Sequence, residues 1–265
     1  MGKISDALER QIKEKEIKVD RIPASKPTNR PPTESFQTTD VNSKLITLYA
    51  PDSIDAENFK LLRSQILFSR ERRRPRIILV TSAFPGEGKS FVSANLAVSI
   101  ALGIEEYVLL LDCDLRRPHI HEMLSLKNTY GLHEYLTGKM SLPDLIIHTP
   151  IEKLSVLLAG TTPSNPIELL SSSTMKAFLE EVKGRYDDRY IVIDSTPLQV
   201  TAETNILANF VDGIIFVVMA HRAPRADVLK AAHKLGKEKI LGIVFNGYEQ
   251  AHKRYYQYYK KYYDK

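Results

Sequence analysis

The segment at residues 77–100 constrains the fold of this chain more than any other. An apolar run at 77–80 leads into the loop Ala83–Ser90, which reads AFPGEGKS, and apolar residues at helical spacing follow from 92 to 100. A strand, a glycine-rich turn and a helix in this order are typical of a nucleotide-binding loop. The glycines let successive backbone N–H groups turn toward phosphate oxygens, and the helix N-terminus adds partial positive charge. We therefore predict a nucleotide-binding loop rather than a surface turn, although Ala83 stands where the general pattern has its first glycine.

The second half of this loop carries the residues that such a site needs. In the general pattern the lysine reaches the β- and γ-phosphates and the next hydroxyl residue coordinates Mg²⁺, which assigns these roles to Lys89 and Ser90. ATP and Mg²⁺ are the expected cofactors. Because Lys89 lies on a ligand-facing loop, we expect Lys89→Met to remove nucleotide binding and to leave the fold intact. The predicted nucleotide-binding residues of the loop are Pro85, Gly86, Glu87, Gly88, Lys89, Ser90 and Phe91.

Aspartates follow two further apolar runs. Residues 108–111 lead into Asp112 and Asp114, and residues 190–193 lead into Asp194. In a parallel sheet flanked by helices, ligands bind beyond the carboxyl ends of the strands, so carboxylates there can face a bound metal–nucleotide. Asp194 suits the support of Mg²⁺ hydration, while Asp112 and Asp114 stand two apart on an extended segment and share one side of it. One strand that ends in aspartate is a weak signal, but three strand-end signals in this order are a strong one.

Apolar runs alternate with helical patterns over most of the chain, which predicts an α/β fold. Strands that are this continuously apolar are typical of a parallel sheet buried on both faces. We therefore predict a P-loop NTPase fold, in which helices flank a mostly parallel, doubly wound central sheet. Strands are expected at residues 76–82, 107–112, 154–158, 189–194, 213–219 and 240–246, with a helix from Asp55 to Ser69 before the first of them.

The composition is consistent with a cytoplasmic location. Hydrophobic residues make up 43% of the 265 residues, enough for a full α/β core, and no apolar stretch approaches the roughly 20 residues that span a bilayer. The N-terminus has no apolar signal core, and a single cysteine excludes an intramolecular disulfide framework. The net charge of +5 is too mild to indicate nucleic acid as a partner, and no recognition motif for nucleic acid is found.

Two N-terminal segments and a C-terminal tail flank the P-loop domain, which is expected to span residues 46–247. Residues 1–18 are expected to form a short amphipathic helix, either a docking peptide or a merely solvated helix. Residues 19–45 are expected to be a disordered linker. Pro, Ser and Thr account for eleven of the residues from 22 to 43, and such a composition cannot offset the ordering entropy.

The C-terminal tail, residues 248–265, is expected to be mobile. It holds seven of the thirteen tyrosines, interleaved with lysine and arginine and without a helical or strand period. A docking tail and a contact to single-stranded nucleic acid are two interpretations, because bases stack on tyrosine beside cations. The nucleotide loop upstream favours a third interpretation, a set of phosphate acceptors. The acceptors would be Tyr255, Tyr256, Tyr258, Tyr259, Tyr262 and Tyr263, with Tyr248 as a further candidate.

Taken together, these residues resemble the bacterial tyrosine kinases that control polysaccharide polymerisation and export. The second aspartate motif of that family has the form hhhDxDxR, matched here by residues 109–116. Further matches are GLHEYLTG at 131–138 and GTTPSNPIELL at 160–170. The resemblance covers roughly residues 50–265, the tyrosine cluster included. The related partitioning and septum-site ATPases carry an additional lysine at the place of Phe84 and have no tyrosine tail, which argues against that class.

The resemblance implies a protein-tyrosine autokinase that phosphorylates the tail in trans within an oligomer. It also implies a transmembrane co-polymerase as activator, a protein-tyrosine phosphatase as antagonist, and a location at the inner face of the cell membrane through the membrane partner. The regulated process would be exopolysaccharide or capsule polymerisation and export. Two alternatives from other classes stay open: an ATPase switch of the partitioning or septum-site type, and a nucleotide-dependent scaffold without kinase activity.

Carried over residue by residue, the family pattern assigns Asp112 as the base that accepts the tyrosine proton. Ser90, Asp114 and Asp194 then surround Mg²⁺, partly through water, and Arg116 steadies this network. The sequence is equally compatible with exchanged roles for Asp112 and Asp114. The predicted catalytic residues are Lys89, Asp112, Asp114, Arg116 and Asp194.

Two further assignments come from the resemblance. Asn246, at the end of the last strand, is either the residue that reads the adenine edge, as its counterpart does in related ATPases, or a turn residue. The family joins subunits into a ring through an E-x-x-R-x-x-R motif, matched here by Glu57, Lys60 and Arg63. A lysine cannot form the bidentate fork of an arginine, so this contact is expected to be weaker here. The plainer interpretation is ion pairing on one helix surface, worth roughly 0.3 kcal/mol per pair.

Overall fold

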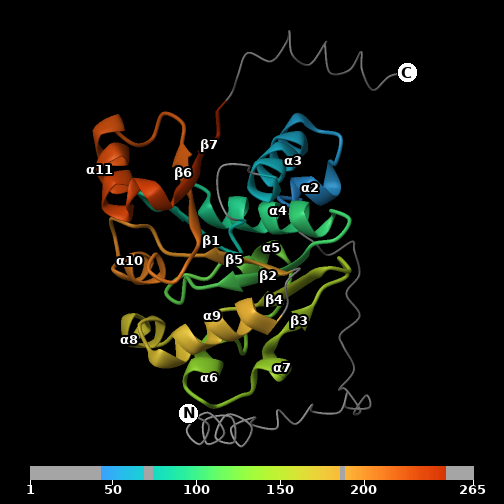
Figure 1. Cartoon of the computed structure of the whole chain (residues 1–265), viewed down its shortest axis with the longest axis vertical. Coiled ribbons are helices and arrows are strands. Elements are labelled where there is room, and N and C mark those ends of the chain that lie inside the picture. Colours follow the sequence, from blue (N-terminus) through green and yellow to red (C-terminus); the bar gives the residue numbers. More distant parts are fainter. Residues whose placement is uncertain (1–42, 69–73, 186–188, 249–265) are drawn as a thin grey trace, which may run out of the picture. The chain divides into compact units, whose positions relative to one another are not determined.

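The computed structural model describes residues 43–68, 74–185 and 189–248. In this part of the chain seven strands form one sheet in the order β3-β4-β2-β5-β1-β6-β7, and every adjacent pair is parallel except β3 with β4. Later strands add on both sides of β1, as in a doubly wound α/β fold (Figure 1). The strands are β1 (Ile77–Ser82), β2 (Tyr107–Asp112), β3 (Ile147–His148), β4 (Leu154–Leu157), β5 (Arg189–Asp194), β6 (Gly213–Met219) and β7 (Ile240–Asn246). The predicted fold class is confirmed.

All six predicted strands are present, with bounds that agree within one residue. The additional strand, β3, cannot be predicted from the sequence because two residues carry no hydrophobic period. The predicted helix before β1 is α3 (Ile54–Leu67). It begins after Ser53, whose hydroxyl accepts a hydrogen bond from the backbone N–H of Ala56 at 3.1 Å and so satisfies a free donor of the first turn.

Helices cover both faces of the sheet because alternate strand residues point to opposite sides. In β1, Ile77 and Leu79 belong to one hydrophobic cluster, and Ile78 and Val80 belong to the other. Figure 1 shows α4 on one side and α9 on the other. The helices on the first side are α2 (Ile46–Tyr49), α3, α4 (Lys89–Ala101) and α5 (Ile120–Met123). Those on the second are α6 (Leu132–Leu136), α7 (Leu142–Leu145), α8 (Pro166–Leu170), α9 (Ser173–Arg185), α10 (Glu203–Leu207) and α11 (Arg225–Leu235).

The helix α4 is buried on almost all sides. It lies between the sheet and α3, and the ring of Phe59 meets the ring of Phe91 edge-on at a centroid distance of 5.9 Å. This position explains why α4 has no exposed polar stripe: even its polar residues Ser93, Asn95 and Ser99 are buried. The helix that follows the glycine-rich loop is therefore held firmly against the sheet.

The last strand, β7, differs from the prediction of a sheet buried on both faces. It forms an edge of the sheet next to β6, and its residues Ile243 and Phe245 are 48% and 67% exposed among the described residues. An apolar run alone does not distinguish an edge strand from a central one, because strand order depends on contacts between distant segments.

The folded part begins slightly earlier than the predicted boundary at residue 46. Leu45 is fully buried, and Asn95 donates its side-chain amide to the carbonyl oxygen of Lys44 at 3.0 Å. The predicted helix at 1–18, most of the predicted linker and the tail tyrosines from Tyr255 onward lie outside the described residues. Tyr248 lies inside them and is exposed. In the residues that are described, no helix combines the length and apolar composition needed to cross a membrane.

Candidate nucleotide site

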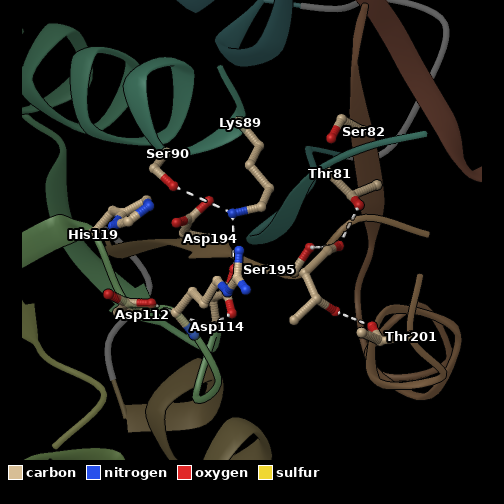
Figure 2. Close-up of polar contacts among 12 residues, drawn as sticks. Thr81, Ser82, Lys89, Ser90, Asp112, Asp114, His119, Asp194, Ser195 and Thr201 are labelled. Atoms are coloured by element: carbon tan, nitrogen blue, oxygen red, sulfur yellow. Dashed lines mark hydrogen bonds and ion pairs between the residues drawn. The ribbon is translucent and has the colours of Figure 1, made fainter. Parts of the chain in front are cut away.

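The predicted strand-end residues meet at one edge of the sheet. The glycine-rich loop connects β1 to α4, while Asp112 ends β2 and Asp194 ends the adjacent strand β5, where the two aspartates are direct register partners. Figure 2 shows Lys89 extended toward this group from the first turn of α4. The structure thus brings together Lys89, Ser90, Asp112, Asp114 and Asp194, as the sequence predicts.

Lys89 is the central cation of this group. Its Nζ donates to Asp114 Oδ2 at 2.9 Å and lies 3.4 Å from Ser90 Oγ. Burial lowers the pKa of Lys89, but the carboxylates of Asp194 and Asp114 outweigh this and raise the pKa above its usual value. Only 8% of the residue is exposed, so we now expect Lys89→Met to destabilise the fold as well as to remove nucleotide binding. The lysine lies on a ligand-facing loop and also neutralises buried carboxylates.

Both carboxylate oxygens of Asp112 accept hydrogen bonds from the segment that follows β2. Its Oδ1 accepts the backbone N–H of Asp114 at 3.1 Å, and its Oδ2 accepts the backbone N–H of Ile120 at 3.2 Å. The side chain is fully buried, and burial raises its pKa well above the usual range, with the carboxylates of Asp194 and Asp114 adding to the effect. Asp112 therefore shapes the segment 112–120, whatever part it takes in proton transfer.

Asp194 offers an oxygen that suits a hydrated metal ion. Its Oδ1 accepts the Ser93 hydroxyl at 3.1 Å, whereas its buried Oδ2 receives no hydrogen bond of normal geometry from the described residues. Burial raises the pKa of Asp194, although Lys89 and the nearby serine hydroxyls act against it. No group of three His, Cys, Asp or Glu in the described ranges could hold a metal alone. The Ser90 hydroxyl with one or two carboxylates fits Mg²⁺, which takes most of its other oxygens from phosphates and water.

Arg116 does not contact the aspartates by a hydrogen bond in the described residues. Instead its Nε pairs with Glu203 Oε1 at 2.6 Å, and Glu203 is only 1% exposed. Burial raises the pKa of Glu203, but hydrogen bonds from Thr201 and Arg116 bring it below its usual value. The pair joins the segment after β2 to the start of α10. The sequence gives no signal for Glu203, because it lies 87 positions away from Arg116.

Side-chain hydrogen bonds of Glu87 and Asn246 hold the backbone of the glycine-rich loop in place. Glu87 is fully buried, and its carboxylate accepts the backbone N–H groups of Phe84 at 2.7 Å and of Met219 at 3.3 Å. Asn246 donates its side-chain amide to the carbonyl oxygen of Glu87 at 3.0 Å. The predicted nucleotide residue Asn246 therefore lies at the site, and its amide nitrogen is engaged with the loop.

The residues of the predicted ring motif make contacts within their own chain. Glu57 pairs with Lys60 at 3.0 Å, Lys60 also donates to the carbonyl oxygen of Pro51, and Arg63 donates to the carbonyl oxygen of Ser99 at 2.6 Å. The Glu57–Lys60 pair matches the plainer interpretation, ion pairing on one helix surface, whereas Arg63 joins α3 to α4. They leave the ring as a proposal.

The two family motifs near 131–138 and 160–170 meet beyond β4. Glu134 accepts the backbone N–H of Gly131 at 2.8 Å and the Thr161 hydroxyl at 2.5 Å. A Cβ at Gly131 would lie 2.1 Å from the carbonyl oxygen of Leu158, so only glycine fits there. We assign a structural role to this junction, since its hydrogen bonds join two loops.

The loop, its helix and the carboxylates at the strand ends define the class of this protein: it is a P-loop NTPase. The family model described as ParA, NUBPL iron-transfer P-loop NTPase, matches residues 74–260. Among curated relatives, tyrosine-protein kinase YwqD of Bacillus subtilis (strain 168) is 36% identical over 217 residues, which are 81% of this chain and 90% of the relative. The putative tyrosine-protein kinase CapB of Staphylococcus aureus is 35% identical over 79% of this chain and 92% of its own. The chain belongs to the bacterial tyrosine kinases, as the resemblance predicts.

Solved structures agree with this assignment. The chimerical protein CapA2B2 is 32% identical with a TM-score of 0.73, over 79% of this chain and 92% of that one. The kinase domain of Escherichia coli tyrosine kinase ETK is 27% identical with a TM-score of 0.70, over 88% of each chain. The septum site-determining protein MinD from Pyrococcus horikoshii OT3, complexed with Mg-ADP, is 26% identical with a TM-score of 0.53, over 64% of this chain and 68% of its own. The TM-score is thus higher for CapA2B2 and for the ETK kinase domain than for this septum-site protein.

Proposed function

We propose that this protein transfers the γ-phosphoryl group of MgATP to the tyrosines of its own C-terminal tail, Tyr255 to Tyr263, in trans within an oligomer. The observation that carries the proposal is the buried cluster of Lys89 with Asp112, Asp114 and Asp194 beside the glycine-rich loop, in a chain whose relatives are named tyrosine-protein kinases. In phosphoryl transfer the protein mainly positions and neutralises the charged phosphate groups and the metal ions bound to them. A lysine can pair with the phosphates, and carboxylates can support the metal ion.

In this proposal Lys89 leaves Asp114 for the β- and γ-phosphates. The ion pair of 2.9 Å would then break, and Asp114 Oδ2 would be available, with Ser90 and Asp194, to hold a hydrated Mg²⁺. The bound Mg²⁺ would neutralise phosphate charge and align the transferring group. Arg116, through Glu203, would hold the segment after β2 in place beside these groups.

Asp112 is the proposed base. A carboxylate whose pKa is raised by burial is a better acceptor for the tyrosine proton than an exposed one, because the two pKa values lie closer together. Its two backbone hydrogen bonds hold it in a single orientation. Asp114 remains the alternative base, with Asp112 then acting through the loop that it shapes.

We expect Asp112→Asn to reduce phosphorylation by roughly 10²-fold, and MgADP affinity much less, because loss of a base affects the transition state more than the ground state. The amide cannot accept at both oxygen positions, so one of the two backbone contacts, to Asp114 or Ile120, is lost as well. Thermal melting should therefore be measured alongside turnover and binding. Equal losses of binding and turnover in a folded variant would remove Asp112 from the role of base.

Regulation and partners follow from the family. We propose a ring-like oligomer that contacts a neighbour through α3, a transmembrane polysaccharide co-polymerase as activator, a tyrosine phosphatase as antagonist, and control of exopolysaccharide or capsule export from the inner face of the membrane. What supports the assembly is the motif Glu57, Lys60 and Arg63 on α3, in a chain that belongs to the bacterial tyrosine kinases. Sedimentation of the purified protein over a range of concentrations would reveal whether it remains a monomer, which would argue against the ring.

The rival function is an ATPase switch or a nucleotide-dependent scaffold, which the likeness to the septum-site protein MinD supports. The mass of the purified protein after incubation with MgATP separates these possibilities. Mass increments of single phosphoryl groups that a tyrosine phosphatase removes are the expected result. ADP release without any added mass, with the cytoplasmic part of a membrane activator present, would favour the switch.

A further inference from the structure

The carbonyl oxygens of the glycine-rich loop are held by side chains that come from three separate strands or their ends. Ser82 Oγ donates to the carbonyl of Phe84 at 2.8 Å, and Arg222 Nη1 donates to the carbonyl of Gly86 at 2.8 Å. Asn246 Nδ2 donates to the carbonyl of Glu87 at 3.0 Å. A loop that binds phosphate must direct N–H groups inward, so its carbonyl oxygens have to be satisfied elsewhere.

Peptide geometry gives these contacts a consequence for the loop. In a planar trans peptide the C=O and the following N–H point in opposite directions. A donor that holds the carbonyl of Gly86 therefore fixes the direction of the N–H of Glu87, and a donor that holds the carbonyl of Glu87 fixes the N–H of Gly88. Arg222 and Asn246 control the two N–H groups that directly precede Lys89.

The two contacts occupy space that glycines leave open behind the loop; Arg222 is itself exposed and reaches Gly86 with the end of its side chain. Gly86 has a φ of +75°, and a Cβ there would lie 2.8 Å from Arg222 Nη1. Gly88 has a φ of +92°, and a Cβ there would lie 2.0 Å from Asn246 Nδ2. The two glycines thus allow these side chains to approach from behind, in addition to letting the backbone turn.

Arg222 is placed by the connection between β6 and α11. His221 before it has a φ of +59°, a left-handed conformation that is uncommon outside glycine, and the N–H of Arg222 bonds to the carbonyl of Met219 at 3.3 Å. Met219 in turn donates its own N–H to Glu87 of the loop. The end of β6 therefore contacts the loop at two points.

We propose that Arg222 and Asn246 are positioning residues of the phosphate-binding loop, which hold the carbonyls of Gly86 and Glu87 outward so that the adjoining N–H groups face the phosphates. The proposal rests on the proposed nucleotide site and deepens it. In this proposal the amide nitrogen of Asn246 binds the loop. The sequence instead suggests a contact of Asn246 with the adenine edge or a role as a turn residue. Inorganic pyrophosphate with Mg²⁺ is the natural probe, because it lacks both base and ribose.

The first test compares Arg222→Ala with Arg225→Ala, which removes the same charge from an exposed position three residues later. We expect Arg222→Ala to weaken MgADP and magnesium pyrophosphate by similar factors, about tenfold or more, since a charged hydrogen-bond donor is lost. Arg225→Ala should bind like the parent, and Arg222→Lys should recover part of the affinity. Parental affinities in Arg222→Ala would overturn the proposal, and so would a loss for MgADP with unchanged pyrophosphate binding.

The second test uses Asn246→Ala and the ratio of MgADP to MgGDP affinity. Loss of pyrophosphate affinity with an unchanged ratio is expected. If pyrophosphate binds normally and the ratio collapses, Asn246 reads the base and the proposal is wrong for this residue. A parent that binds neither probe would overturn the nucleotide site itself. A parent that binds both without phosphorylating tyrosine, even with the activator's cytoplasmic part present, would overturn the kinase function and leave this inference standing.

Discussion

Lys89→Met is expected to abolish tyrosine phosphorylation and also to destabilise the protein without nucleotide. Phosphorylation and MgATP affinity should fall roughly 10²-fold or more, because the cation that faces the transferring phosphoryl group is removed. The same change leaves Asp114, Asp112 and Asp194 buried near one another without their shared counter-ion. Breaking a buried ion pair from one side costs about 3 kcal/mol, which corresponds to a melting temperature lower by roughly 6–12 °C for a domain of this size.

A double variant separates the two effects. Lys89→Met with Asp114→Asn removes both partners of the ion pair, and the amide oxygen of Asn can still accept the backbone N–H that Asp114 accepts from Arg117 at 3.0 Å. We expect melting to recover toward that of the parent while phosphorylation stays absent. Lys139→Met, at an exposed position, is the matched control and should change neither. Equal melting temperatures for parent and Lys89→Met would show that the ion pair contributes nothing to stability.

Phosphorylation of the tail is expected to occur between molecules. The double variant with an intact tail serves as the inactive acceptor, and an active chain that ends at Gly247 serves as the donor kinase. The acceptor should gain phosphate on Tyr255, Tyr256, Tyr258, Tyr259, Tyr262 and Tyr263 only in the mixture. A chain of eighteen residues has a typical end-to-end distance of about 24 Å when flexible, which suffices to reach a neighbouring site across a close subunit contact.

The control for this mixture is an acceptor in which these tail tyrosines are replaced by phenylalanine. An intact acceptor that gains no phosphate, even with the activator's cytoplasmic part present, would rule out transfer in trans.

The same mixture tests a second hypothesis, that negative charge accumulated on the phosphorylated tail expels it from the neighbour's aspartate-rich site and loosens the oligomer. The unmodified tail carries a net charge of +3 with its histidine neutral. Each phosphotyrosine adds about −1.5 to −2, so six of them would bring the tail to roughly −6 to −9. An oligomer that sediments unchanged after phosphorylation would contradict charge-driven release.

The sequence by itself determined the class of site. The loop at 83–90 and the aspartates after two strands are local patterns, and the chemistry of a metal–nucleotide requires those residue types at those spacings. The period of the apolar residues likewise determined the strands and α3 to within two residues. Such features depend on neighbours within about ten positions, and therefore a single sequence displays them.

Only the tertiary structure decided which partners the side chains have. Arg116 pairs with Glu203 instead of the aspartates, Lys89 is buried in an ion pair, and β7 is an exposed edge. Arg222 holds the carbonyl of Gly86 across 136 positions of sequence. These contacts follow from strand order and from the paths of the connecting segments, which bring distant residues to one edge of the sheet. Hydrophobic periodicity records which face of a strand is buried, but it carries no information about which strand lies beside it.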